Sequence, residues 1–98
     1  MIYVVATLRI RPESLEAMAE AAIPAIAATR REPGCRFYDM HASITDPERV
    51  TFIERWSTRA ALEAHFASTH VAAFLAASQR HVVASTIEII HPERVESL

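Results

Sequence analysis

Apolar and polar positions alternate with different periods along the chain, and the first half contains two clear patterns. Residues 2–10 are rich in β-branched and aromatic side chains, which predicts a strand with apolar groups on both faces. Residues 13–32 predict an amphipathic helix, because apolar side chains recur every three to four residues at Leu15, Met18, Ala22 and Ile26. Pro33-Gly34 then predicts the end of this helix.

Two strand-like segments follow at residues 35–43 and 49–56. The short connection between them contains Asp46-Pro47, a turn signal, so we expect an antiparallel hairpin. Asp39 and Arg55 fall on one face of this hairpin, and we expect them to pair across the strands or at a contact between two chains.

The last third of the chain contains two helical stretches and one strand. Residues 58–67 predict a short helix with Ser57 or Thr58 as its N-cap, and residues 70–80 predict a restart after an interruption at Ser68-Thr69. Residues 82–90 predict the final strand, and residues 91–98 form a polar tail.

The predicted order β-α-β-β-α-β is that of an α+β domain of the ferredoxin-like kind, which occupies residues 1–98 as a single domain. It has a four-stranded antiparallel sheet with helices on one face. The final strand carries apolar residues on both of its faces, including Val83 and Ile87 in one row and Val82 and Ile90 in the other. We therefore expect a second sheet, from another copy of the chain, to cover the open face.

Composition adds to this picture and excludes several classes of protein. The hydrophobic share of 51% is high for one small core, which also favours a homodimer. A net charge of −2 without a basic stripe argues against nucleic acid as a partner, and no apolar run is long enough to span a membrane. The chain shows no signal-peptide pattern and has one cysteine, Cys35, so we expect a cytoplasmic protein.

Three segments together resemble the antibiotic biosynthesis monooxygenase (ABM) family: ATRREPGCRFYDMHAS, DPERVTFIERWST and ALEAHFASTH. Members of this family include cofactor-independent quinol monooxygenases, and they typically form dimers in which two sheets face each other in an α+β barrel. The resemblance implies that architecture here, and it implies oxidation of a quinol-like or polycyclic aromatic molecule by O₂ without a cofactor.

Strand alternation identifies the polar group with the best claim to chemistry. Phe52, Glu54 and Trp56 share one face of their strand, and we assign that row to the helix side together with Tyr38 of the preceding strand. A glutamate between two aromatic residues needs a partner when it is buried, and burial raises its pKa. His65, on the helix that covers this face, is the candidate partner.

We assign His65 and Glu54 as catalytic candidates, with His65 as a general base or a hydrogen-bond donor toward a phenolic hydroxyl. Trp56, Tyr38 and Phe74 are candidate substrate contacts, of which Trp56 offers a stacking surface and an indole N–H. Each also has a structural interpretation: a histidine at a helix–sheet contact, a core tryptophan, and aromatic residues that only line the core.

The sequence gives little support for metal or haem. His65 and His70 are five residues apart, which does not match two ligands on one face of a continuous helix, so we expect no metal site. Haem-degrading relatives carry asparagine, tryptophan and histidine where this chain has Thr7, His65 and Leu75. Thr7 remains a candidate substrate contact.

Two other functions stay open at this level. One is a non-catalytic dimer that binds a small molecule in the same pocket. The other is an isomerase of a small oxygenated metabolite, with His65 moving the proton.

Overall fold

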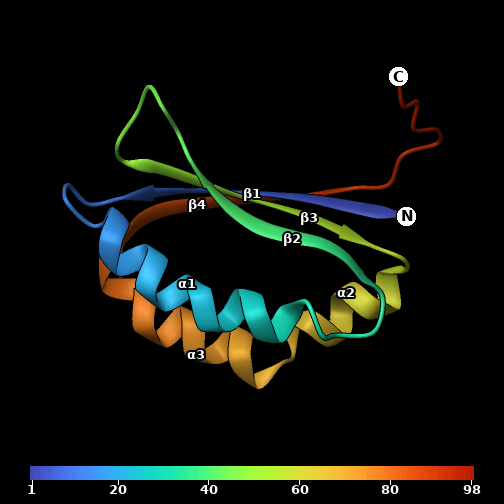
Figure 1. Cartoon of the computed structure of the whole chain (residues 1–98), viewed down its shortest axis with the longest axis horizontal. Helices are drawn as coiled ribbons and strands as arrows, with labels where there is room; N and C mark the ends of the chain where they lie inside the picture. Colours follow the sequence, from blue (N-terminus) through green and yellow to red (C-terminus); the bar gives the residue numbers. More distant parts are fainter.

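The computed structural model describes residues 1–98 as a layer of sheet packed against a layer of helices (Figure 1). The elements are β1 (Ile2–Ile10), α1 (Leu15–Thr29), β2 (Cys35–Ala42), β3 (Arg49–Trp56), α2 (Arg59–Phe66), α3 (Thr69–Ser78), a short 3-10 turn (Gln79–His81) and β4 (Val82–Ile90). The predicted ferredoxin-like order is confirmed, with the second helical region divided into α2 and α3. No helix has the length and apolar content needed to cross a membrane.

The sheet is antiparallel throughout and has the strand order β2-β3-β1-β4. Tyr38 of β2 lies opposite Glu54 of β3, and Glu54 lies opposite Val4 of β1. This register places Tyr38 and Glu54 side by side on the face that the helices cover, as the alternation of side chains along each strand requires.

The core fills the space between this face and the helices. Alternate residues of β1 and β3 are buried there, including Val4, Ile10, Val50 and Trp56. Met18 and Ala22 of α1 and Leu62 of α2 pack onto them from the helix layer. Figure 1 shows α1 and α3 side by side beneath the sheet, with α2 at the end where β3 finishes.

The break between α2 and α3 depends on Ser68. Its side chain accepts a hydrogen bond from the Val71 backbone N–H at 3.3 Å, which caps α3, and it donates one to the His65 carbonyl at 2.7 Å. One serine therefore ends one helix and starts the next, and it fixes the direction in which the chain turns between His65 and His70.

The turn after α1 is closed by Gly34, which has φ of 85°. A β-carbon at this position would lie 2.7 Å from the Ala61 β-carbon and 2.7 Å from the Ser57 hydroxyl oxygen, so only glycine fits. This close approach holds the turn, and Glu32 within it, against the start of α2.

The expected pairing of Asp39 with Arg55 across the two strands is wrong, whereas a pairing between two chains stays a prediction. A register irregularity between Cys35 and Phe37 places Phe37 opposite Arg55, whose guanidinium carbon lies 5.2 Å from the centre of the Phe37 ring. Asp39 instead lies opposite Ile53 and forms an ion pair with Arg30 of the α1 C-cap at 3.6 Å.

Candidate functional site

A cavity of about 490 Å³ lies between the sheet and α3. Its wall is mostly apolar, with Phe52 from β3 and Phe74 from α3 among the larger side chains. The polar residues that line it are Tyr38, Glu54, His65, Ser78, Gln79 and Ser85. An apolar cavity of this size with a few polar groups is typical of a site for a small organic molecule.

Glu54 lies on the floor of the cavity and is 5% exposed. Its Oε1 accepts a hydrogen bond from the Trp56 indole N–H at 3.0 Å. Burial raises the pKa of the Glu54 carboxyl, and the Trp56 hydrogen bond and nearby His65 partly oppose that effect. No arginine lies within ion-pair distance of Glu54.

His65 extends from the last turn of α2 into the site and is 3% exposed. Its Nδ1 lies 2.7 Å from the Glu32 Oε2, so its hydrogen-bond partner is Glu32 and not Glu54 as the sequence suggested. Its ring packs at 4.7 Å from the Trp56 ring and 5.1 Å from the Tyr38 ring, measured between ring centres. These contacts hold the imidazole in one orientation at the end of the cavity.

Tyr38 completes the polar end of the cavity. Burial, followed by the nearby negative charges of Glu54 and Glu32, raises the pKa of the Tyr38 phenol well above its ordinary value. A tyrosine phenol is protonated at neutral pH, and these surroundings extend that to higher pH, so it can donate a hydrogen bond to a ligand.

Three polar atoms at this end have no hydrogen-bond partner in the protein: Tyr38 Oη, Glu54 Oε2 and His65 Nε2. The one fully buried side-chain oxygen or nitrogen without a partner is Thr29 Oγ1. These three atoms are therefore not sealed from solvent. Because their residues line the cavity, they are the atoms available to a bound molecule.

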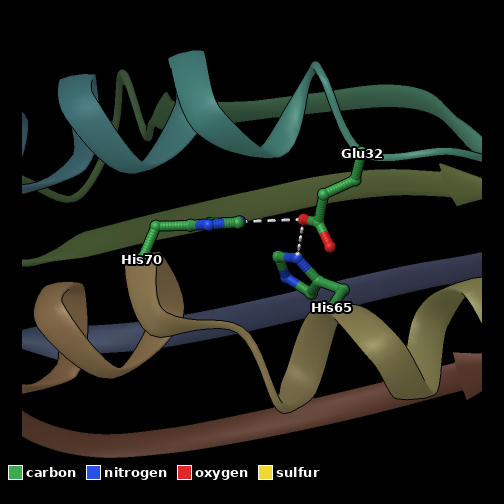
Figure 2. A group of neighbouring side chains, drawn as sticks. All are labelled: Glu32, His65 and His70. Atoms are coloured by element: carbon green, nitrogen blue, oxygen red, sulfur yellow. Dashed lines mark hydrogen bonds and ion pairs between the residues drawn. The ribbon is translucent and has the colours of Figure 1, made fainter.

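Glu32 is the residue that organises this end of the site, and Figure 2 shows it between two histidines. Its Oε2 lies 2.7 Å from His65 Nδ1 and 2.9 Å from His70 Nε2. An ionised carboxylate only accepts hydrogen bonds, so each ring donates an N–H to it. A neutral His65 then carries its proton on Nδ1, which leaves the Nε2 lone pair free.

Sequence reasoning missed Glu32 and His70. Glu32 precedes Pro33-Gly34 at a helix end, where an acidic residue is unremarkable, and its histidine partners lie more than thirty positions away. His70 stands near the start of a helix, where a histidine commonly faces solvent, but here it is half-buried against Glu32 and Ser68 is the cap. The acidic residue before the turn and the two histidines around Ser68 were the available signals.

The structure brings Tyr38, Glu54, His65 and Phe74 together on the cavity wall. Trp56 lies beneath this wall, fully buried, and reaches the site only through its hydrogen bond to Glu54 and its contact with His65. Thr7 belongs to the alternate row of β1, opposite Thr51 and Thr86, and faces away from the helices and the cavity.

The sequence and this fold match one family. The model of the family described as "Antibiotic biosynthesis monooxygenase" matches residues 1–77. The chain belongs to the ABM family. The resemblance found in the sequence is thereby confirmed, and the family that the chain belongs to is described as one of monooxygenases.

Two curated relatives illustrate the similarity. "Putative monooxygenase Rv0793" from Mycobacterium tuberculosis is 38% identical over 69 residues, covering 70% of this chain and 67% of the relative. "Probable quinol monooxygenase YgiN" from Escherichia coli is 28% identical over 102 aligned positions, covering 94% of this chain and 98% of the relative.

Solved structures agree with the fold. The structure of Rv0793 has a TM-score of 0.87 at 27% identity and covers 98% of both chains. The structure of protein SO0527 from Shewanella oneidensis has a TM-score of 0.87 at 30% identity, covering 93% of this chain and 89% of that chain.

Proposed function

We propose that this ABM protein is a cofactor-independent monooxygenase that oxidises a small quinol-like aromatic molecule with O₂. The observation that carries the proposal is the set of free polar atoms, Tyr38 Oη, Glu54 Oε2 and His65 Nε2, at one end of an apolar cavity. An aromatic ring fits the apolar wall, and its hydroxyl groups fit the polar end. The names of the relatives YgiN and Rv0793 support the same class of reaction.

His65 is the general base in this proposal. Its Nε2 takes the proton from a substrate hydroxyl, and the resulting imidazolium is stabilised by the Glu32 carboxylate on its Nδ1–H. The phenolate that remains is electron-rich and passes one electron to O₂. Combination of the resulting substrate radical with superoxide forms the new carbon–oxygen bond.

The overall reaction balances without an external reductant. A quinol and O₂ yield a hydroxyquinone and water, since the substrate loses two hydrogens, gains one oxygen and thereby supplies all four electrons. One atom of O₂ enters the product and the other leaves as water. The imidazolium of His65 returns its proton to the departing oxygen species, so the base is regenerated.

Tyr38 and Glu54 orient the substrate. The neutral Tyr38 phenol donates to a substrate oxygen, and the Glu54 carboxyl, held by Trp56, binds a second hydroxyl. Phe52 and Phe74, whose ring centres lie 5.5 Å apart, contribute aromatic surface to the cavity wall.

The proposal includes a homodimer joined through the uncovered sheet faces. Val5 and Ile53 are paired on this face, and both are only partly exposed. Tyr3 and Ile90 add a neighbouring apolar pair on the same face. Burial of these side chains against a second sheet would stabilise both chains.

The experiment is O₂ consumption by EDTA-treated protein with a panel of naphthoquinols, benzoquinols and anthrones, followed by mass spectrometry of the products formed under ¹⁸O₂. We expect one ¹⁸O atom in the product. Glu32→Gln should lower kcat about 100-fold with a smaller change in KM, because the amide does not stabilise the imidazolium. Glu63→Gln, which alters an exposed ion pair with Arg59, is the matched control.

Absence of O₂ consumption above the uncatalysed rate with every member of the panel would contradict the proposal. Ligand-induced thermal stabilisation without turnover would instead indicate a binding protein. Exchange of substrate protons with D₂O without O₂ uptake would indicate an isomerase.

A further inference from the structure

We propose that Glu32, His65 and His70 form a binding site for one divalent transition-metal ion of the zinc type. The Glu32 carboxylate oxygen, His65 Nδ1 and His70 Nε2 all lie within 4.8 Å of one another. Two imidazole nitrogens and one carboxylate oxygen form a donor set that zinc uses with a fourth, open position. In Figure 2 both imidazole rings point at the same carboxylate oxygen from different helices.

The donor atoms need only small movements to hold an ion. The two nitrogens lie 2.7 and 2.9 Å from Glu32 Oε2, so their ring N–H groups are directed into one small volume. Zinc–nitrogen and zinc–oxygen distances are about 2.0–2.2 Å, and an ion that replaces the shared hydrogens therefore lies between all three atoms. Displacements of the donor atoms by a fraction of an ångström to about 1 Å, through side-chain rotation, suffice for the ligand spacing of a tetrahedral site.

The charge of the region also favours a cation. Glu32 has no arginine within ion-pair distance, and the chain contains no lysine. Its only ion-pair partners are the two histidines, and the nearby Glu54 forms no ion pair. The Glu32 side chain is 14% exposed, so its negative charge is poorly screened by water and attracts a metal ion more strongly than a surface carboxylate does.

The site is held by backbone structure and is open on one side. Glu32 is fixed in a turn by its own N–H bond to Thr29, and Ser68 fixes the chain between the two histidines. The His70 and Glu32 side chains remain 23% and 14% exposed, so an ion can reach them from solvent.

The metal would control the protonation of His65. A neutral imidazole that coordinates through Nδ1 must carry its proton on Nε2, which changes the cavity-facing nitrogen from an acceptor to a donor. This consequence rests on the proposed function: the zinc-loaded protein would lose its general base and consume O₂ more slowly. The metal site itself depends only on the three side chains.

The test is isothermal titration of EDTA-treated, desalted protein with ZnCl₂ at pH 7.5. We expect one ion per chain. Glu32→Gln and His70→Gln should each weaken binding by about tenfold or more. His41→Gln removes an exposed histidine that does not belong to the cluster and should leave zinc affinity unchanged. Absence of binding by the wild type, or equal binding by all four proteins, would overturn the site.

Nitrogen NMR of the histidine rings gives a second measurement that does not depend on variants that fold well. Zinc should move the His65 proton from Nδ1 to Nε2 and shift the nitrogen resonances of both His65 and His70. Zinc binding that leaves these resonances unchanged would overturn the proposal. Either result is independent of O₂ uptake by the EDTA-treated protein, so the metal site and the proposed function fail separately.

Discussion

At the scale of single residues, each ionisable group in the site has a role set by its neighbours. Glu32 is shared by two imidazoles, Glu54 is bonded by an indole, and burial and negative charge raise the pKa of the Tyr38 phenol. Two carboxylates in one small region thus have different surroundings, since Glu32 is bonded to two histidines while Glu54 lines the cavity.

Glu54 gives a prediction about stability and pH. Burial raises its pKa in the folded state, so Glu54 contributes stability at acid pH that is lost as pH rises through the folded pKa. Glu54→Gln keeps an acceptor for the Trp56 N–H and removes the buried charge, so we expect its Tm at pH 7 to be a few degrees above that of the wild type.

Thermal melting of both proteins between pH 4 and pH 8 measures this effect. The Tm difference between the variant and the wild type should shrink as pH falls below the ordinary pKa of a glutamate. The contradicting result is a variant that is less stable than the wild type by the same amount at every pH. It would show that the Glu54 side chain stabilises the fold through packing and that its charge does not destabilise the fold.

At the scale of elements, the α2–α3 break positions the site, and it is also where sequence reasoning was most limited. The alternation of side chains in β3 identified Glu54. The order of strand-like and helix-like segments identified the sheet and its covering helices. The interruption at Ser68 was visible, but its geometry was not. Because the helix is broken between His65 and His70, their relative position does not follow the spacing of a continuous helix. His70 can therefore reach Glu32.

Ser68→Ala tests this role of the break. Loss of the cap should lower the free energy of unfolding by about 1 kcal/mol, and it should also lower turnover because His65 and His70 lose their common anchor. Thr58→Ala is the matched control, since Thr58 caps α2 through Ala61 but its side chain forms no hydrogen bond with the histidines.

Urea unfolding and O₂ uptake are measured on both variants. We expect similar losses of stability and a loss of turnover in Ser68→Ala alone. Equal turnover in the two variants would show that the break does not position the site.

At the scale of the whole molecule, helices cover one face of the sheet and leave the other uncovered in a single chain (Figure 1). The cavity lies on the covered face. The predicted order of elements, and strands with apolar residues on both faces, indicated this arrangement of the two sheet faces from the sequence. The contacts of Glu32 could not be predicted, because they join three segments whose relative placement depends on packing of the entire helix layer.

The proposed dimer is tested on the uncovered face. Light scattering at micromolar concentration should give twice the chain mass of 10.9 kDa. Ile53→Lys places a charge in the centre of that face and should shift the protein to monomers, whereas Ile44→Lys, at a fully exposed hairpin position, should not. A wild type that scatters as a monomer would contradict the dimer.

The central claim is that His65, held by Glu32, acts as a base on a molecule bound in the cavity. The most direct measurement is the O₂-uptake rate of the metal-free wild type, His65→Gln and His41→Gln with the best substrate of the quinol panel. We expect His65→Gln to lose about 100-fold or more in kcat and His41→Gln to match the wild type. Equal rates for all three proteins, with every variant folded, would contradict the account.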